Sequence, residues 1–306
     1  MTTTPLTFPP VIDSSMRSEF ISCPHSFFRR YIQGLQMPHR SIHLHFGSSF
    51  ADGIAALRAA FYRDNLPLED AMAVGAAAIV KAWGDFPEEV EGSAKSLYRC
   101  IGALDSYCAQ YPPATDHVRP VIEQGAIHTE FNFAVPLPIR HPQTGEPLLY
   151  SGRFDMLGDM GGLKVIEDDK TTSQLGPTWG TQWRLRAQFT GYAWGASEFG
   201  HRIDGIVVRG ISILKTQYGH AEVIEQRPRW MIDRWKLQLE RDIHRMIEMW
   251  KMFSLDYNPY EWDQALDSAC SAYGGCQFLD LCTSADPAKW LSQYETTHYD
   301  PLGATE

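Results

Sequence analysis

Two acidic residues and a lysine in the middle of the chain have the types and spacing of a hydrolytic metal site. Asp155 lies in the strand-like stretch LLYSGRFDML, and Asp168 and Lys170 lie in LKVIEDDK. Because side chains alternate along a strand, Asp168 and Lys170 would share one face. Glu167 and Asp169 would take the other. Asp155 on the neighbouring strand would face Asp168, and two adjacent carboxylates repel unless a cation joins them.

The chemistry that this set predicts is metal-dependent cleavage of a phosphodiester. Oxygen ligands suit a hard divalent ion such as Mg²⁺ or Mn²⁺. Such an ion polarises a phosphate and lowers the pKa of a bound water. Lys170 would steady the attacking hydroxide or the developing charge on the phosphorane.

Two strands and a helix must position these groups. The stretches 148–157 and 163–170 are separated by a glycine-rich turn, which indicates a hairpin. In the stretch that follows, Arg184, Gln188 and Tyr192 recur every four residues, which predicts one face of a helix. A guanidinium, an amide and a phenol on that face would hold a phosphate backbone without reading its bases.

The ordered set Gly152-x-x-Asp155, Asp168-x-Lys170 and Gln188-x-x-x-Tyr192 resembles the motifs of the PD-(D/E)XK nuclease superfamily. The last element is similar to the RecB/AddB-like branch, which includes CRISPR adaptation nucleases and many phage exonucleases. The resemblance implies an α/β (α+β) fold with a restriction-endonuclease-like core, a central mixed sheet flanked by helices, in a bacterial or phage protein. The bland alternative, turn residues and a solvated strand end, requires three coincidences.

One part of the family pattern is missing. Relatives often carry Gly-x-x-x-His on an early helix, with the histidine as a metal ligand, whereas the stretch FGSSFADGI has Ala51 at that position. His43, His45 and Asp52 lie nearby but out of place. The remaining ligands would be Asp155, Asp168 and the backbone carbonyl of Asp169, so a weakened or decayed site is a possible outcome. Glu130 is a further carboxylate that could face the site, although the pattern favours an exposed strand residue.

The cysteines form a second constellation. The last three are spaced with five residues between neighbours, and another lies near the N-terminus, giving the set Cys23, Cys270, Cys276 and Cys282. Relatives in the resembled branch often hold a [4Fe-4S] cluster with one N-terminal and three C-terminal cysteines, although their C-terminal spacing is tighter. Four thiolates could instead hold structural Zn²⁺. Cys100 and Cys108 fit a helix core.

Composition excludes several other classes. The chain has 306 residues, of which 44% are hydrophobic, enough for a sizeable core. No apolar run approaches the ~20 residues that span a bilayer, and the N-terminus lacks a signal-peptide pattern, so we expect a cytoplasmic protein. The net charge of −10 disfavours tight duplex binding and favours a narrow channel for single-stranded DNA. Candidate channel residues are Arg29, Arg30, Arg184, Arg186, Trp179 and Trp183, the two tryptophans being equally suited to the core.

The pattern along the chain predicts a loose arm over 1–13 and a single nuclease-like domain over 14–306. Within it we expect a helical part over 14–111, a catalytic sheet and motif helix over 120–226, and a long helix with a Cys-rich closure over 227–306. The main functional hypothesis is a divalent-metal-dependent exonuclease acting on single-stranded DNA ends. The alternatives are a decayed nuclease fold that binds DNA or assembles with partners, and a structure-selective endonuclease.

Overall fold

The computed structural model describes residues 6–38, 41–266, 268–272 and 275–303. The chain divides into two compact units. The terminal unit comprises Met1–His39, Phe133–Gly152 and Asp233–Glu306, and the central unit comprises Arg40–Asn132 and Arg153–Ile232. Three elements run through both units: β6 (Thr129–Arg140), β7 (Pro147–Met160) and α7 (Arg229–Asp256).

The central unit is built on a mixed sheet in which β7, β8 (Leu163–Thr172), β9 (Gly205–Ile213) and β10 (Tyr218–Gln226) follow one another in that order. Strand β8 runs antiparallel to β7 and parallel to β9, and β9 runs antiparallel to β10. All nine residues of β9 are buried, as expected for a largely apolar strand covered on both faces. The further elements of this unit are α3 (Ile42–Arg58), η2 (Ala59–Arg63), α4 (Leu68–Trp83), α5 (Leu97–Gln110), β3 (Arg119–Pro120), β4 (Ile122–Glu123), β5 (Ala126–Ile127), β8 (Leu163–Thr172), η3 (Thr181–Trp183), α6 (Ala187–Glu198), β9 (Gly205–Ile213) and β10 (Tyr218–Gln226).

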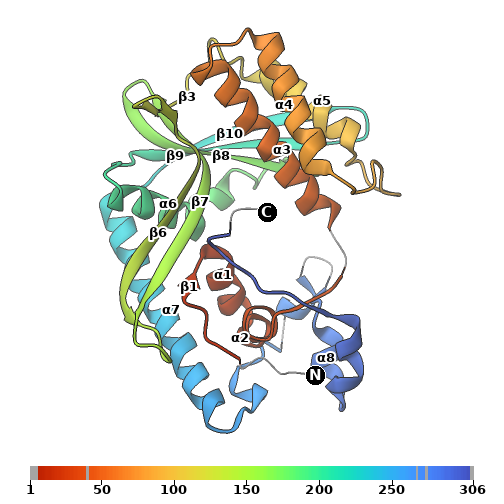
Figure 1. The fold of residues 1–306 in the computed structure, drawn as a ribbon, viewed down its shortest axis with the longest axis vertical. Coiled ribbons are helices and arrows are strands. Elements are labelled where there is room, and N and C mark those ends of the chain that lie inside the picture. Colours follow the sequence, from red (N-terminus) through yellow and green to blue (C-terminus); the bar gives the residue numbers. More distant parts are fainter. Residues whose placement is uncertain (1–5, 39–40, 267, 273–274, 304–306) are drawn as a thin grey trace. The chain divides into compact units, whose positions relative to one another are not determined.

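Helices α3, α4 and α5 pack together beside β9 and β10 (Figure 1). Their apolar side chains recur at helical spacing and form one core cluster with Ile211 and Ile213 of β9. Helices α3 and α4 approach closely at two glycines. A Cβ atom on Gly53 would lie 2.5 Å from Ile79 Cγ1, and one on Gly75 would lie 2.9 Å from the carbonyl oxygen of Gly53. The mixed sheet flanked by helices confirms the predicted fold class.

The terminal unit has an aromatic core in which Phe20, Phe27 and Phe28 pack around Trp262. Strand β1 runs parallel to β7 at Leu149 and Tyr150. The elements of this unit, besides those it shares, are β1 (Val11–Ile12), α1 (Ser14–Ser22), α2 (Pro24–Phe27), η1 (Phe28–Ile32), β2 (Leu35–Gln36), η4 (Pro259–Glu261), η5 (Ser268–Cys270), α8 (Leu279–Thr283), η7 (Pro287–Gln293) and β11 (Glu295–Thr296). None of the described helices is both long and apolar enough to cross a membrane.

Two N-terminal segments differ from the sequence-based prediction. The helical part predicted from residue 14 onward is interrupted at Cys23, because α1 (Ser14–Ser22) ends before it and α2 (Pro24–Phe27) begins after it. Proline disfavours helical backbone in the residue before it, and Cys23 accordingly has extended backbone with φ −159° and ψ 107°. The arm over 1–13 was expected to be loose. Residues 1–5 lie outside the described residues, but Phe8 and Ile12 are fully buried.

Candidate active site

An acidic centre forms where β7 and β8 diverge from their regular pairing. The ladder between them ends at Met156 opposite Glu167, and beyond it the Asp169 backbone N–H donates to Asp155 Oδ2 at 2.7 Å. Lys170 Nζ forms an ion pair with Asp168 Oδ1. The Asp168 side chain is 2% exposed and that of Lys170 32% exposed. The three residues singled out by their sequence spacing therefore lie together, held by adjacent strands.

A third carboxylate joins this centre from β6. Glu130 has φ +51°, a left-handed conformation that is strained for a residue with a side chain and that concentrates at functional sites. Its Oε2 lies 3.2 Å from Arg153 Nε. Burial raises the pKa of Glu130 to about 7, and the nearby Asp155 carboxylate contributes to the rise. Sequence reasoning favoured an exposed strand residue here, because simple alternation cannot anticipate a left-handed residue.

The electrostatics of the centre favour a bound cation. Burial raises the pKa of Asp155, and repulsion from Asp168 adds to the rise. Burial also raises the pKa of Asp168, although the Lys170 ammonium opposes it. Burial alone would lower the pKa of Lys170, but the Asp168 and Asp155 carboxylates outweigh it and the pKa rises. Several acids thus share one ammonium, and an all-oxygen donor set of this kind fits a hard divalent ion.

The opposite face of β8 carries a buried ionic network. Glu167 is fully buried and accepts hydrogen bonds from Arg58, from Tyr107 at 3.0 Å and from Arg209 at 3.2 Å. Arg58 also lies 3.1 Å from Asp169 Oδ2. The alternation expected along β8 is therefore present, with Glu167 and Asp169 facing away from the acidic centre. Sequence reasoning missed the two arginines, although an arginine inside the apolar run of β9 was a visible clue.

Helix α6 covers the Lys170 face of β8. The Lys170 ammonium lies 5.9 Å from the centre of the Phe189 ring. One helical turn joins Gln188 to Tyr192, and Gln188 Nε2 donates to the Tyr192 hydroxyl at 2.6 Å. The Tyr192 ring packs against Phe154 of β7 at 5.7 Å. The two predicted helix residues are therefore paired with each other on the helix that packs over the lysine.

The predicted helix starts later than expected, and this separates Arg184 from the pair. Helix α6 begins at Ala187, so Arg184 precedes it, and the prediction of a shared helix face for Arg184 was wrong. Its side chain is 68% exposed and lies 3.3 Å from Glu225 of β10. Trp179 and Trp183 are buried against each other, with their rings 5.4 Å apart, so they serve the core.

The early helix supplies no histidine at the family position. Ala51 lies on α3, as expected. His45 Nε2 pairs with the Trp83 carbonyl at 3.1 Å, and its ring stacks on Phe86 at 4.1 Å. These contacts account for His45 without a metal. His43 is exposed on the same helix.

The geometry agrees with a comparison of the sequence against protein families. The model of the PD-(D/E)XK nuclease superfamily matches residues 15–283. The chain belongs to this superfamily. Membership implies a nucleic-acid substrate and hydrolysis of phosphodiester bonds, which agrees with the composition of the acidic centre.

Solved structures give more distant similarities to this PD-(D/E)XK protein. A presumed exonuclease from Eubacterium rectale is 11% identical, with a TM-score of 0.46 over 78% of this chain and 82% of that chain. The protein SSO0001 is 12% identical, with a TM-score of 0.33 over 82% and 87% of the two chains. No curated protein matches the sequence.

Four cysteines of this PD-(D/E)XK protein line one small pocket in the terminal unit, together with apolar side chains such as Leu266 and Phe278. They are Cys23, Cys270, Cys276 and Cys282, and all are free thiols. The Phe278 N–H donates to Cys276 Sγ at 3.5 Å, a bond of the kind that tunes metal-bound sulfur.

A buried cation lies beside these thiols. Arg29 is 6% exposed, and its charge interacts with Cys282. Burial lowers the pKa of Arg29, while Cys282 opposes that change. A buried guanidinium near Cys282 suits an anionic thiolate-bound group, so the donor set fits an iron–sulfur cluster or zinc. The buried position of Arg29 near Cys282 does not suit the predicted role of a channel residue.

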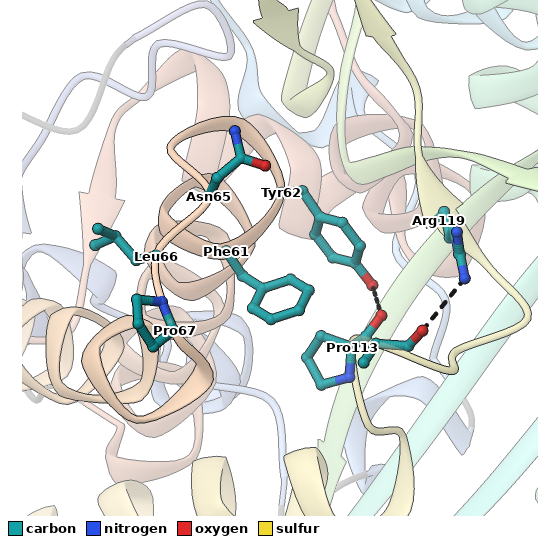
Figure 2. Close-up of a pocket in the computed structure, with 8 residues that line it drawn as sticks. Phe61, Tyr62, Asn65, Leu66, Pro67, Pro113 and Arg119 are labelled. Carbon is teal, nitrogen blue, oxygen red and sulfur yellow. Dashed lines mark hydrogen bonds between the residues drawn. The ribbon is translucent and has the colours of Figure 1, made fainter.

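A separate pocket of about 530 Å³ in the central unit has no acidic or thiol side chain in its lining (Figure 2). Its lining includes Phe61, Tyr62 and Pro113, and the Tyr62 hydroxyl donates to the Pro113 carbonyl at 2.8 Å. Arg119 is its charged side chain and donates to the Ala114 carbonyl at 3.2 Å. With no carboxylate among its lining residues, this pocket is no candidate for hydrolysis.

Proposed function

We propose that the protein is a divalent-metal-dependent DNA nuclease that degrades single-stranded DNA from its ends. The observation that carries this proposal is that Asp155 and Asp168 share the Lys170 ammonium, while the Glu130 carboxylate lies near Asp155. Three acids with raised pKa values are costly to hold together without a cation. Their position on adjacent strands of a PD-(D/E)XK core supports a role for that cation in phosphodiester hydrolysis.

Each group of the centre has a distinct role in this proposal. Asp155, Asp168 and the backbone carbonyl of Asp169 would hold Mg²⁺ or Mn²⁺, and Glu130 would supply the ligand that Ala51 cannot. When bound, the ion polarises the phosphate and lowers the pKa of its water. The Lys170 ammonium, paired with Asp168, would stabilise the hydroxide and the charge that develops on phosphorus.

In this proposal, substrate binding depends on α6 and on the residues that precede it. The Gln188 amide and the Tyr192 hydroxyl, already hydrogen-bonded to each other, would orient the strand through its phosphates, as in the RecB/AddB-like branch. Arg184, exposed before the helix, can contact a phosphate only by leaving Glu225. The net charge of −10 favours a single strand gripped locally over duplex bound along a broad basic surface.

The direct experiment uses end-labelled linear single strands, circular single strands and duplex, each with Mn²⁺. We expect short products from linear single strands and none from circles. Asp168→Asn should abolish cleavage, while Asp70→Asn, an exposed carboxylate on α4, should cleave like the parent. Cleavage of circles would instead favour a structure-selective endonuclease. Cleavage by Asp168→Asn at the parental rate would refute the assigned centre, and no carboxylate-dependent Mn²⁺ binding would indicate a decayed site.

We also propose that the four pocket cysteines hold a [4Fe-4S] cluster, with structural zinc as the alternative. The proposal is supported by the single apolar pocket, the N–H···S bond to Cys276 and the buried Arg29. The group would join the α1–α2 junction to the C-terminal segment. The visible absorption spectrum of anaerobically purified protein decides between the two: a brown protein with iron and sulfide supports the cluster, and a colourless zinc protein refutes it.

A further inference from the structure

A second constellation of metal-binding side chains lies in the central unit. Glu123, His128 and His201 each point a ligating atom to one place, and these atoms all lie within 4.8 Å of one another. Glu123 ends strand β4, His128 follows strand β5, and His201 follows helix α6. Residues up to 78 positions apart in the sequence therefore lie close together, and none of them belongs to the acidic centre.

Local backbone structure holds all three in place. The hairpin of β4 and β5 turns at Gln124 and Gly125, both with positive φ, as in the tight turns that suit a hairpin. The His128 N–H donates to the Val121 carbonyl at 3.0 Å, and its carbonyl accepts from Leu157 of β7 at 2.9 Å.

The end of α6 fixes the third residue. Gly200 has φ +86°, and the His201 N–H donates to the Ala196 carbonyl at 3.0 Å. This is the six-to-one bond of a Schellman cap, which defines the direction of the chain after the helix. His201 is therefore positioned by the cap and not by a flexible loop.

The side chains leave one nitrogen in need of a partner. Nε2 of His128 is buried and, within the described residues, makes no hydrogen bond. The carboxylate oxygen of Glu123 lies 3.6 Å from it. Phe131 packs against both imidazoles, with its ring centre 5.8 Å from that of His128 and 5.8 Å from that of His201. A buried imidazole nitrogen without a hydrogen bond is destabilising, and in the neutral ring with the proton on Nδ1 a metal ion can bind the free lone pair of Nε2.

We propose that Glu123, His128 and His201 bind a zinc ion, through two imidazole nitrogens and one carboxylate oxygen. Ligands 2.0–2.1 Å from a tetrahedral zinc ion lie roughly 3.4 Å apart, close to the separation of His128 and Glu123. Three protein ligands leave the fourth position to water. Imidazoles select zinc where the all-oxygen acidic centre selects Mg²⁺ or Mn²⁺.

The zinc ion would clamp the β4–β5 hairpin to the end of α6. That helix carries Gln188 and Tyr192, so the clamp would hold the substrate-orienting helix at its far end. Lys164 Nζ lies 3.7 Å from Glu123 Oε1 and would have to yield this oxygen, or leave Glu123 bound through the other one.

The test is zinc binding by the purified full chain in excess Mg²⁺, which occupies the acidic centre. Calorimetry gives the Kd, and zinc-edge X-ray absorption distinguishes nitrogen and oxygen ligands at 2.0–2.1 Å from sulfur at 2.3 Å. We expect one zinc ion with an imidazole-containing nitrogen and oxygen shell. His128→Gln and His201→Gln should each weaken it by about tenfold or more.

Two further variants keep the test decisive. His43→Gln replaces an exposed histidine elsewhere in the same unit and should bind zinc like the parent. Glu123→Gln alters a side chain that is 47% exposed, so it should fold even if a histidine variant does not, and its affinity should also fall. A zinc shell made only of sulfur, or equal affinity in the parent and in Glu123→Gln, would overturn the proposal.

Discussion

The acidic centre and the cysteine pocket place their ligating atoms in different ways. The acidic centre takes its position from β7 and β8, where ladder pairing and the Asp169 N–H fix Asp155 against Asp168. The cysteines come from short elements: the α1–α2 junction, the turn ending at Cys270, the loop at Cys276, and α8. One site is assembled by the sheet, whereas the other, in our proposal, would depend on a bound metal group to hold its parts together.

The largest effect should come from the network that anchors β8. Glu167→Gln removes the carboxylate shared by Arg58 and Arg209, and leaves two buried guanidinium groups with less compensation. We expect a loss of about 3–5 kcal/mol in the free energy of unfolding, measured by urea denaturation. Glu222→Gln, which breaks the more exposed pair with Arg209, is the control and should cost less. Equal losses would show that the sheet does not depend on this buried pairing.

The chemistry of the acidic centre should be separable from its stability. Lys170→Met should lower the rate of DNA cleavage by about 10²–10³-fold, because it removes a group that stabilises the transition state. In saturating Mg²⁺, which would neutralise the buried acids in place of the ammonium, the urea midpoint should change less than in Glu167→Gln. Lys81→Met, on the exposed face of α4, should leave both quantities unchanged. Cleavage by Lys170→Met at the parental rate would contradict the role assigned to this ammonium.

The cysteine pocket should show the opposite behaviour. Cys276→Ser should lower the free energy of unfolding by roughly 2–4 kcal/mol through the loss of a cross-link, together with the bound iron or zinc. Cleavage by the folded fraction should persist. Cys100→Ala, a buried thiol outside the pocket, should keep the metal content. Full metal content in Cys276→Ser would contradict the assignment, as would parental stability after metal loss.

The smallest effect concerns the electrostatic cost of holding carboxylates close together before a metal ion binds. The pKa of Glu130 is raised to about 7 in the folded protein from an ordinary value near 4.5. Its ionisation therefore destabilises the fold, with no penalty below pH 4.5 and the full penalty above pH 7. In EDTA, Glu130→Gln should gain about 2 kcal/mol over the parent between these limits, after allowing for partial exposure. A constant difference across this range would contradict the raised pKa.

Sequence reasoning reached the parts of the site that follow from regular periodicity. Alternation along 163–170 separates Asp168 and Lys170 from Glu167 and Asp169, and the structure has that arrangement. The mixed sheet and its flanking helices also followed from strand and helix patterns. The functional roles of these residues remain predictions that the variants above will test.

The features that escaped prediction depend on irregular backbone or on distant partners. Glu130 reaches the centre through a left-handed residue inside a strand, and Arg58 finds Glu167 across 109 positions of sequence. Neither feature produces a periodic pattern in the sequence. The break at Cys23, by contrast, was readable, because Pro24 restricts the residue before it.

The positions of the pocket cysteines along the chain determine when, during translation, all four are present. Cys23 leaves the ribosome about 250 residues before Cys270, which at 5–20 residues per second is a delay of roughly 12–50 s. During that interval the first thiol has none of its three partners and is open to oxidation or to stray metal. If these thiols hold the proposed metal group, its delivery must wait until Cys282 has been synthesised, so rapid overexpression in air should yield a protein with an incomplete metal complement.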